Sequence, residues 1–439
     1  MVNFKNTSQF FRPAFIIGLL SFIPINIPMP ISDNGKMEVY LIELFLPVLF
    51  FYICSLILKK KYLMSVLVKY LFYLVLVFIV YYFFISIYRY INGYEIKQSL
   101  LALRTTLPPL IILLLIDSKI IKIKELLIDL ILLNLLINII QLFNIDILRM
   151  SPFMGNIMVY LSVILLLLPL NFYILLENKS FKYSKIISLI AIFNITIALI
   201  FPALGGSRIA FYLACGVFLV CMIVYSFINK KLFSRAIISL MIAVTFLSII
   251  WYTNPQGMSF GLYRLFPMDV EQVLVPDDIH NKSELTEKQK NKLKIIDETV
   301  QVMQQETTAS NDIRSYLWEK SIDEILESPL LGKGTIYFEF PNNYNVTQQA
   351  AHNFILEYTN AYGIIGLIIF LSFIFVTVLY TTRYNFNIKD TRKNIIKFNL
   401  IMSIGIMFAI SLFQPTMLII SPVIFFWLII SLNYGLITD

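Results

Sequence analysis

Residues 157–176 read IMVYLSVILLLLPLNFYILL and carry no charged side chain. A helix needs about 17–25 mostly apolar residues to cross a lipid bilayer, and this run has that length. Apolar residues fill the run continuously and do not alternate with polar ones, which excludes the pattern of a transmembrane β-strand. Because lipid offers backbone groups no hydrogen-bond partner, the run is predicted to be a transmembrane α-helix.

Similar runs recur along the whole sequence. The chain has 439 residues and 58% of them are hydrophobic, whereas a soluble protein is about half apolar. Short polar or charged links separate the runs, so we predict an all-α polytopic membrane protein with about 12 transmembrane helices and one large helical loop on its outer face. Pro24, Pro28 and Pro30 are expected to break the end of the first span. The expected spans are 13–30, 38–58, 64–88, 99–117, 121–143, 156–177, 186–205, 208–229, 235–252, 359–380, 395–412 and 415–433.

The basic residues favour one orientation in the membrane. The formal net charge is +8, and Lys and Arg concentrate in alternate links such as 59–61 and 230–231. Cytoplasmic loops carry such an excess, so both termini are expected in the cytoplasm and residues 253–358 on the outer face. The positive charge is thus an indicator of topology, and no nucleic acid partner is expected.

This topology divides the chain into three parts. Residues 1–252 are expected to form a transmembrane bundle of about nine helices, residues 253–358 an outer helical loop domain, and residues 359–439 a bundle of about three helices. In the loop, the segment DIRSYLWEKSIDEILES shows helical periodicity after an N-cap signal. Its apolar stripe consists of Trp318, Ile322, Ile325 and Leu326.

Several classes of chemistry leave no trace in the sequence. The three cysteines lie in apolar runs, where they are expected to be small buried residues. There is no zinc-ligand spacing, phosphate-binding glycine loop, nucleophile elbow or dinucleotide fingerprint. We therefore predict neither a metal nor a cofactor, and expect chemistry on the outer face to use an activated substrate delivered in the membrane.

Two arginines of the outer face stand next to predicted helix starts. Arg208 follows a Gly-Gly pair in ALGGSRIAFYL and opens the span 208–229, and a helix N-terminus beside flexible glycines favours phosphate. Arg314 lies in the first turn of the loop helix, where a cation is mildly disfavoured, which hints at a role outside the helix. The structural alternatives are that Arg208 reaches lipid headgroups and that Arg314 pairs with Asp312.

The chain has only two histidines, His280 and His352. His352 stands in AHNFILEYTNAYGIIG, where the outer loop returns to the membrane. A helix N-terminus favours the neutral imidazole, which is the form that a general base needs. The alternative is that His352 is a polar helix cap.

Two more arginines are candidates for a polar site. Arg104 lies inside the expected span 99–117, and Arg264 lies just beyond the span 235–252. An ionisable residue at membrane depth usually faces a polar cavity. A purely structural role at the membrane interface is the alternative for both residues.

Three stretches together resemble a known family. GGSRIAFYL is followed by NDIRSYLWEKSIDEILESPLLGKG and then by AHNFILEYTNAYGIIGL. An Arg, a Trp four residues later, a Pro-Leu-Leu-Gly-x-Gly turn, and an Ala-His-Asn before Tyr-Gly-Ile-Ile-Gly resemble the O-antigen polymerase and O-antigen ligase superfamily. The resemblance covers roughly residues 186–380.

The resemblance implies a metal-independent, membrane-embedded glycosyltransferase without a cofactor. Its donor is a glycan on undecaprenyl diphosphate at the periplasmic or outer face. The arginines that hold the diphosphate in the family match Arg208 and Arg314, and the family's histidine, which takes a proton from the acceptor hydroxyl, matches His352. The expected substrate-binding residues are Arg264, Arg104, Asn353 and Trp318, the last as a sugar-stacking surface.

These features predict a polymerase that joins undecaprenyl-diphosphate-linked repeat units into O-antigen or capsular polysaccharide in a bacterial inner (plasma) membrane. Its expected partners are the lipid-linked donor and acceptor, membrane lipids and, as a further candidate, a chain-length regulator protein. One alternative is an O-antigen ligase that transfers glycan to lipid A-core or to protein. An alternative of another class is a lipid-linked oligosaccharide flippase, although the two similar halves typical of transporters are not seen. The sequence leaves the sugars, the linkage and the choice between polymerase and ligase open.

Overall fold

The computed structural model of the protein describes residues 12–28, 36–58, 65–94, 107–119, 121–143, 157–177, 183–205, 207–253, 313–338, 349–383, 391–413 and 420–438. Its labelled helices are α1 (Pro13–Leu20), α2 (Leu41–Leu58), α3 (Val66–Asn92), α5 (Leu107–Asp117), α6 (Ile123–Leu142), α7 (Ile157–Glu177), α8 (Ser184–Leu204), α9 (Arg208–Ile228), α10 (Lys230–Thr253), α15 (Phe354–Arg383), α16 (Thr391–Ser411) and α17 (Ile420–Thr438). A further helix spans residues 313–327. The strands β1 (Pro24–Pro28) and β2 (Lys36–Tyr40) pair antiparallel, as do β3 (Tyr337–Phe338) and β4 (Gln349–Ala350).

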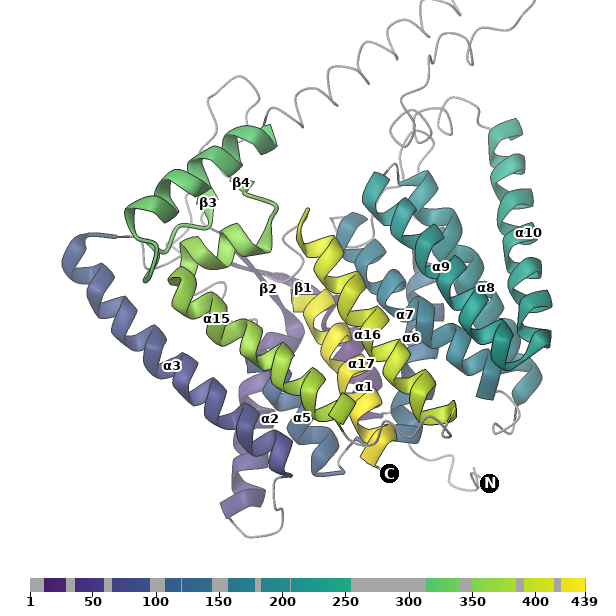
Figure 1. Ribbon diagram of the computed structural model, residues 1–439, viewed down its shortest axis with the longest axis horizontal. Coiled ribbons are helices and arrows are strands. Elements are labelled where there is room, and N and C mark those ends of the chain that lie inside the picture. The colour runs from purple at the N-terminus through teal and green to yellow at the C-terminus, as the bar shows by residue number, and fades with distance from the viewer. Residues whose placement is uncertain are drawn as a thin grey trace, which may run out of the picture.

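The architecture is that of a polytopic helical membrane protein (Figure 1). Within the described residues, eight helices are long and apolar enough to cross a membrane, namely α3, α6, α7, α8, α9, α10, α15 and α16. Shorter apolar helices occur in α2 and α17. The predicted fold class is confirmed at this level, whereas the total of about 12 spans and the division into three parts remain predictions.

The expected span 13–30 is wrong in its second half. The helix α1 ends at Leu20, and the chain continues as strand β1, whose backbone pairs with β2 from Pro24 opposite Tyr40 to Pro28 opposite Lys36. Proline has no backbone N–H and fixes φ, so two prolines four residues apart oppose a helix but are compatible with the edge of a small sheet. The same pairing turns the first residues of the expected span 38–58 into a strand.

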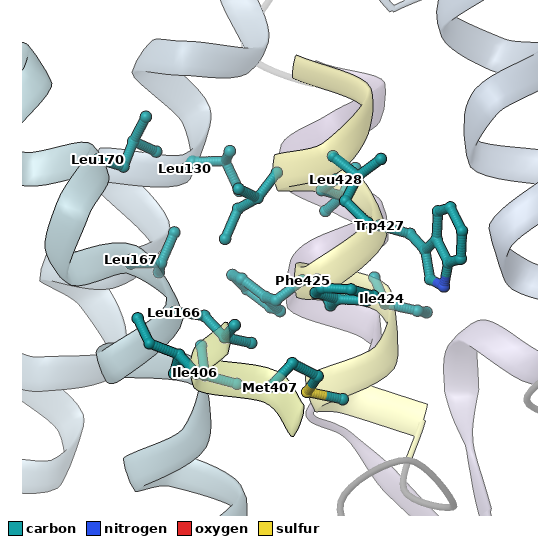
Figure 2. Packing of buried hydrophobic residues seen from close by; sticks show 14 of the residues in the cluster. Leu130, Leu166, Leu167, Leu170, Ile406, Met407, Ile424, Phe425, Trp427 and Leu428 are labelled. Carbon is teal, nitrogen blue, oxygen red and sulfur yellow. The ribbon is translucent and has the colours of Figure 1, made fainter. Parts of the chain in front are cut away.

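The run that indicated the fold forms the central helix of the bundle. In α7, 94% of the membrane-spanning residues are buried, compared with 17% in α10. The helix packs against α8, α9, α16 and α17, which explains why its sequence is apolar on every side. Figure 2 shows Leu166 and Leu167 of α7 in one buried cluster with Ile406 of α16 and Phe425 of α17.

A small polar cluster joins three helices inside this apolar bundle. Asn138 of α6 donates Nδ2–H to Asn194 of α8 at 2.9 Å, and the hydroxyl of Tyr160 in α7 donates to Asn138 Oδ1 at 2.9 Å. Further bonds link Asn138 to Asn134 and Asn194 to Asn171. These five residues, the asparagine cluster, are all buried and hydrogen-bonded to one another. In an apolar medium such bonds hold helices together.

Candidate functional site

The helix α15 begins immediately after an unusual backbone conformation at His352. Asn353 caps the helix, because its Oδ1 accepts hydrogen bonds from the backbone N–H groups of Ile355 at 3.0 Å and Leu356 at 3.4 Å. His352 has φ +55°, a left-handed conformation that residues other than glycine adopt rarely and that occurs often at functional sites. The helix start predicted next to His352 is confirmed, and a substrate contact of Asn353 remains a prediction.

The helix of residues 313–327 lies close to this helix start. Its Trp318 donates Nε1–H to the backbone oxygen of Ala351 at 2.7 Å. Ala351 directly precedes His352, so Trp318 fixes the position of the peptide that carries the imidazole. A sugar-stacking role for Trp318 remains a prediction.

The apolar stripe expected for this helix is not its buried face. Ile322 and Leu326 are 47% and 72% exposed, whereas Leu317 and Ser321 are fully buried. Trp318 ties the helix to Ala351 at one end, and the turn after residue 327 ties it to α15 at the other. These two attachments, which the apolar periodicity does not encode, set the rotation of the helix.

The turn Pro329–Gly334 packs directly on a bend in α15. The bend lies at Gly363, where φ is +68° and ψ is 178° within an otherwise helical run, and Figure 1 shows that α15 changes direction along its length. Gly332 has φ +65°, and a Cβ on it would lie 2.5 Å from the oxygen of Asn360. A Cβ on Gly363 would collide with the backbone oxygen of Leu330. The two glycines therefore allow two backbones to touch.

An arginine that the sequence analysis did not select fastens this contact to α3. Arg89 is fully buried at the end of α3 and donates hydrogen bonds to the backbone oxygens of Leu331, Gly332 and Ala361. Nearby, the hydroxyl of Tyr81 donates to the oxygen of Tyr362 at 2.6 Å. A guanidinium offers five N–H donors in a rigid fork, which suits a group of carbonyl oxygens. Arg89 thus joins α3, the turn and α15 into one unit.

The three residues selected as a catalytic set influence one another electrostatically. The pKa of Arg314 is lowered by burial and then by the positive charge of Arg208. The pKa of His352 is lowered to about 4 by burial and then by the positive charge of Arg314. Because such effects weaken with distance, Arg208 of α9 acts on Arg314, and Arg314 acts on His352 at the start of α15. At neutral pH the imidazole of His352 is therefore neutral.

The other selected arginines fall outside the described residues. The substrate-binding roles expected for Arg104 and Arg264 therefore remain predictions. In the part of the chain that the structure describes, no group of three or more His, Cys, Asp or Glu side chains is placed to hold a metal ion.

One residue of the site was missed by sequence reasoning. Glu357 lies in the first turn of α15 and is 1% exposed. Among the described residues, neither of its carboxyl oxygens has a hydrogen-bond partner. The sequence offered only an acidic residue in the first turn of an apolar helix, which is ordinary at that position, so its burial is what distinguishes it.

A comparison with protein families covers the part of the chain that holds these residues. Residues 191–371 match the family model of the O-antigen ligases, and this range includes Arg208, Arg314, His352 and Glu357. The match is consistent with the O-antigen polymerase and ligase superfamily and, with the apolar helices, supports a membrane-embedded, glycosyltransferase-like enzyme of polysaccharide or lipopolysaccharide biosynthesis. No curated protein matches the sequence.

Proposed function

We propose that this protein is a polymerase of lipid-linked glycans. It transfers a growing glycan from undecaprenyl diphosphate to a second undecaprenyl-diphosphate-linked repeat unit and so builds O-antigen or capsular polysaccharide. The site faces the periplasmic or outer side of the bacterial inner membrane, and both termini are cytoplasmic. This orientation agrees with the excess of Lys and Arg in alternate links and with about 12 spans in total.

The observation that supports this function is the electrostatic influence of Arg208 on Arg314 and of Arg314 on a neutral His352. A diphosphate leaving group gains negative charge in the transition state, and fixed cations placed where this charge develops lower the barrier. Arginine binds phosphate oxygens in pairs. Arg208 and Arg314 meet this requirement, and their mutual repulsion, visible in the lowered pKa of Arg314, is relieved when an anion lies between them.

The reaction follows from these positions. His352 takes the proton of the acceptor hydroxyl as the oxygen attacks the anomeric carbon of the donor sugar. The bond from this carbon to the diphosphate oxygen breaks, and undecaprenyl diphosphate leaves against Arg208 and Arg314. The bound diphosphate also favours the imidazolium that forms, because a nearby anion raises the pKa of a histidine.

A reconstituted assay tests the proposal. Purified protein in nanodiscs is supplied with synthetic undecaprenyl-diphosphate-linked repeat units, without nucleotide and with EDTA, and products are separated on a gel. A ladder spaced by one repeat unit is the expected result, and His352→Ala protein is the negative control. If transfer requires a divalent metal ion, the metal-independent mechanism is wrong.

A ligase is the second candidate because the matching family model describes O-antigen ligases. It would use the same arginines and histidine with a different acceptor. Transfer that occurs only after lipid A-core or a protein acceptor is added would establish this activity. Absence of transfer to every acceptor, together with movement of the lipid-linked glycan across the bilayer, would instead indicate a flippase.

A further inference from the structure

Buried polar atoms without a partner concentrate around the start of α15. Most of the buried side-chain nitrogen and oxygen atoms that lack a hydrogen bond among the described residues lie in two neighbouring segments, the helix of residues 313–327 and the first turns of α15. Buried polar groups in proteins are nearly always hydrogen-bonded, so each exception needs an explanation. The residues concerned are Ser321, Glu324, His352, Glu357 and Asn360.

Two of these groups are chemically complementary. The Nδ1 atom of His352 and both carboxyl oxygens of Glu357 are buried without a partner in the described part of the chain. A neutral imidazole carries one N–H donor, and a carboxylate only accepts. A hydrogen bond from Nδ1–H to the carboxylate would satisfy both groups together.

The helix geometry directs Glu357 toward His352. Side chains of an α-helix lean toward its N-terminus, and Glu357 is four residues after the capping residue Asn353, about 6 Å along the axis. The carboxyl accordingly lies near the backbone N–H groups of His352 and Asn353, although not in hydrogen-bonding geometry. The first of these N–H groups belongs to His352, the residue that also carries the imidazole.

The charges around His352 create a need for such a partner. Burial and Arg314 lower the pKa of His352 to about 4, and the positive charge of Arg208 acts in turn on Arg314. A general base works best when its pKa lies near the working pH, so two cations alone leave the imidazole a weak base. Besides burial, the charge that acts on the imidazole is that of Arg314 from the helix of residues 313–327, on which Arg208 of α9 acts in turn. An ionised Glu357 in the first turn of α15 would favour proton uptake by His352.

We propose that Glu357 is a positioning residue for His352, whose carboxylate accepts the hydrogen bond of Nδ1–H and so leaves Nε2 free to take the proton of the acceptor hydroxyl. This inference rests on the proposed function. The hydrogen bond selects one tautomer of the imidazole and holds the ring in place. When Nε2 has received its proton, the carboxylate stabilises the imidazolium, as the acidic member of a catalytic triad does.

The first experiment reads the tautomer directly and does not depend on activity. His280→Ala leaves His352 as the single histidine of the chain, so protein labelled with ¹⁵N-histidine gives the two nitrogen signals of one residue. In lipid bilayers at neutral pH, we expect the proton on Nδ1. In the double variant that combines His280→Ala with Glu357→Gln, the proton is expected to move to Nε2 or to give a mixture of the two tautomers. An unchanged tautomer, or a proton on Nε2 when Glu357 is present, would overturn the proposal.

The second experiment measures transfer kinetics. Glu357→Gln is expected to lower kcat by about 100-fold, as loss of effective base catalysis does, while KM for the lipid-linked donor stays within about twofold. Glu319→Gln makes the same change at an exposed carboxylate of the neighbouring helix and is expected to keep full activity. Full activity of Glu357→Gln would refute the positioning role.

The two experiments separate the two levels of inference. If the wild-type protein transfers glycan to no acceptor, the proposed function fails, and the tautomer still decides whether Glu357 pairs with His352. If transfer occurs but the tautomer does not respond to Glu357→Gln, the function stands and the positioning role fails. A Glu357→Gln variant that loses its folded state is recognised by its size-exclusion profile. In that case the tautomer measured in the His280→Ala protein, which retains Glu357, decides whether Glu357 pairs with His352.

Discussion

The asparagine cluster and the start of α15 are two polar regions with opposite hydrogen-bonding states. In the asparagine cluster, side chains of α6, α7 and α8 donate to and accept from one another at 2.9–3.2 Å. At the start of α15, His352, Glu357 and Asn360 bury polar atoms that have no partner among the described residues. Both regions remove polar groups from water, and only one satisfies them internally.

The difference separates a structural role from a reactive one. A satisfied polar cluster holds helices in one arrangement and gains nothing from a ligand. An unsatisfied one costs stability and retains hydrogen-bonding capacity for a group that arrives later. His352 adds a left-handed backbone, which is a second local cost of the kind found at functional sites. Substitutions in the two regions should therefore act on different properties.

The largest expected effect is on activity at the reactive region. His352→Ala should lower the transfer rate by about 1,000-fold, because it removes the general base. The amount and thermal stability of the protein should be nearly unchanged, since Nδ1 of His352 has no hydrogen-bond partner among the described residues. The measurement is the initial rate with lipid-linked repeat units. Retained transfer would return His352 to the role of a polar residue beside the helix cap.

The next largest effect on activity is expected at Arg314, the arginine whose charge acts on His352. Arg314→Lys should lower the rate by about 100-fold, because lysine keeps the charge and loses the paired contact with phosphate oxygens. Lys320→Arg, an exposed change on the same helix, is the matched control and should be silent. Equal rates for Arg314→Lys and the wild type would mean that the diphosphate is held elsewhere.

A third effect falls on stability beside the reactive region. Gly363→Ala should cost about 2–3 kcal/mol, because alanine is strained at φ +68° and its Cβ would meet the oxygen of Leu330. Gly405→Ala in α16 meets no atom within 4 Å and should change stability by less than about 1 kcal/mol. Thermal unfolding in detergent compares the two variants. Similar unfolding temperatures would show that the turn moves away from α15 at little cost.

The smallest effect is expected in the asparagine cluster. Asn138→Leu removes the hub of the cluster and should lower stability by about 1 kcal/mol, as hydrogen bonds between membrane helices contribute little individually. Transfer per folded molecule should not change. A loss of activity at wild-type stability would remove the distinction between the two regions.

The sequence predicted those parts of the fold that depend on local hydrophobicity. The continuous apolar run of α7 predicts both a transmembrane helix and a central position, and burial of 94% of its spanning residues agrees. The break of the first span at its prolines was expected, but the strand β1 that follows and its pairing with β2 were not, because an apolar count does not register strand pairing. The β1–β2 pairing is formed between segments whose sequences carry no strong strand pattern.

Candidate site residues could be selected from the sequence where their type or position is unusual. Residues were missed where their importance depends on contacts with parts of the chain that are distant in sequence. His352, Arg208 and Arg314 stood out by position and chemistry; Arg208 acts electrostatically on Arg314 and Arg314 on His352, and their catalytic roles remain predictions. Arg89 did not stand out, because its partners Leu331 and Ala361 follow it by more than 240 residues. Glu357 did not stand out either, because an acidic residue in the first helical turn is ordinary until its burial is known.

The hydrogen bond from Trp318 to Ala351 provides a built-in optical probe. The chain has three tryptophans, and the indole N–H of Trp318 is attached to the peptide that precedes His352. Its fluorescence should respond when a lipid-linked glycan displaces or tightens this bond, while Trp427, buried in the helix bundle, provides a constant background. Subtracting the emission of Trp318→Phe protein would isolate the signal, so donor binding and acceptor binding can be followed in real time without a label.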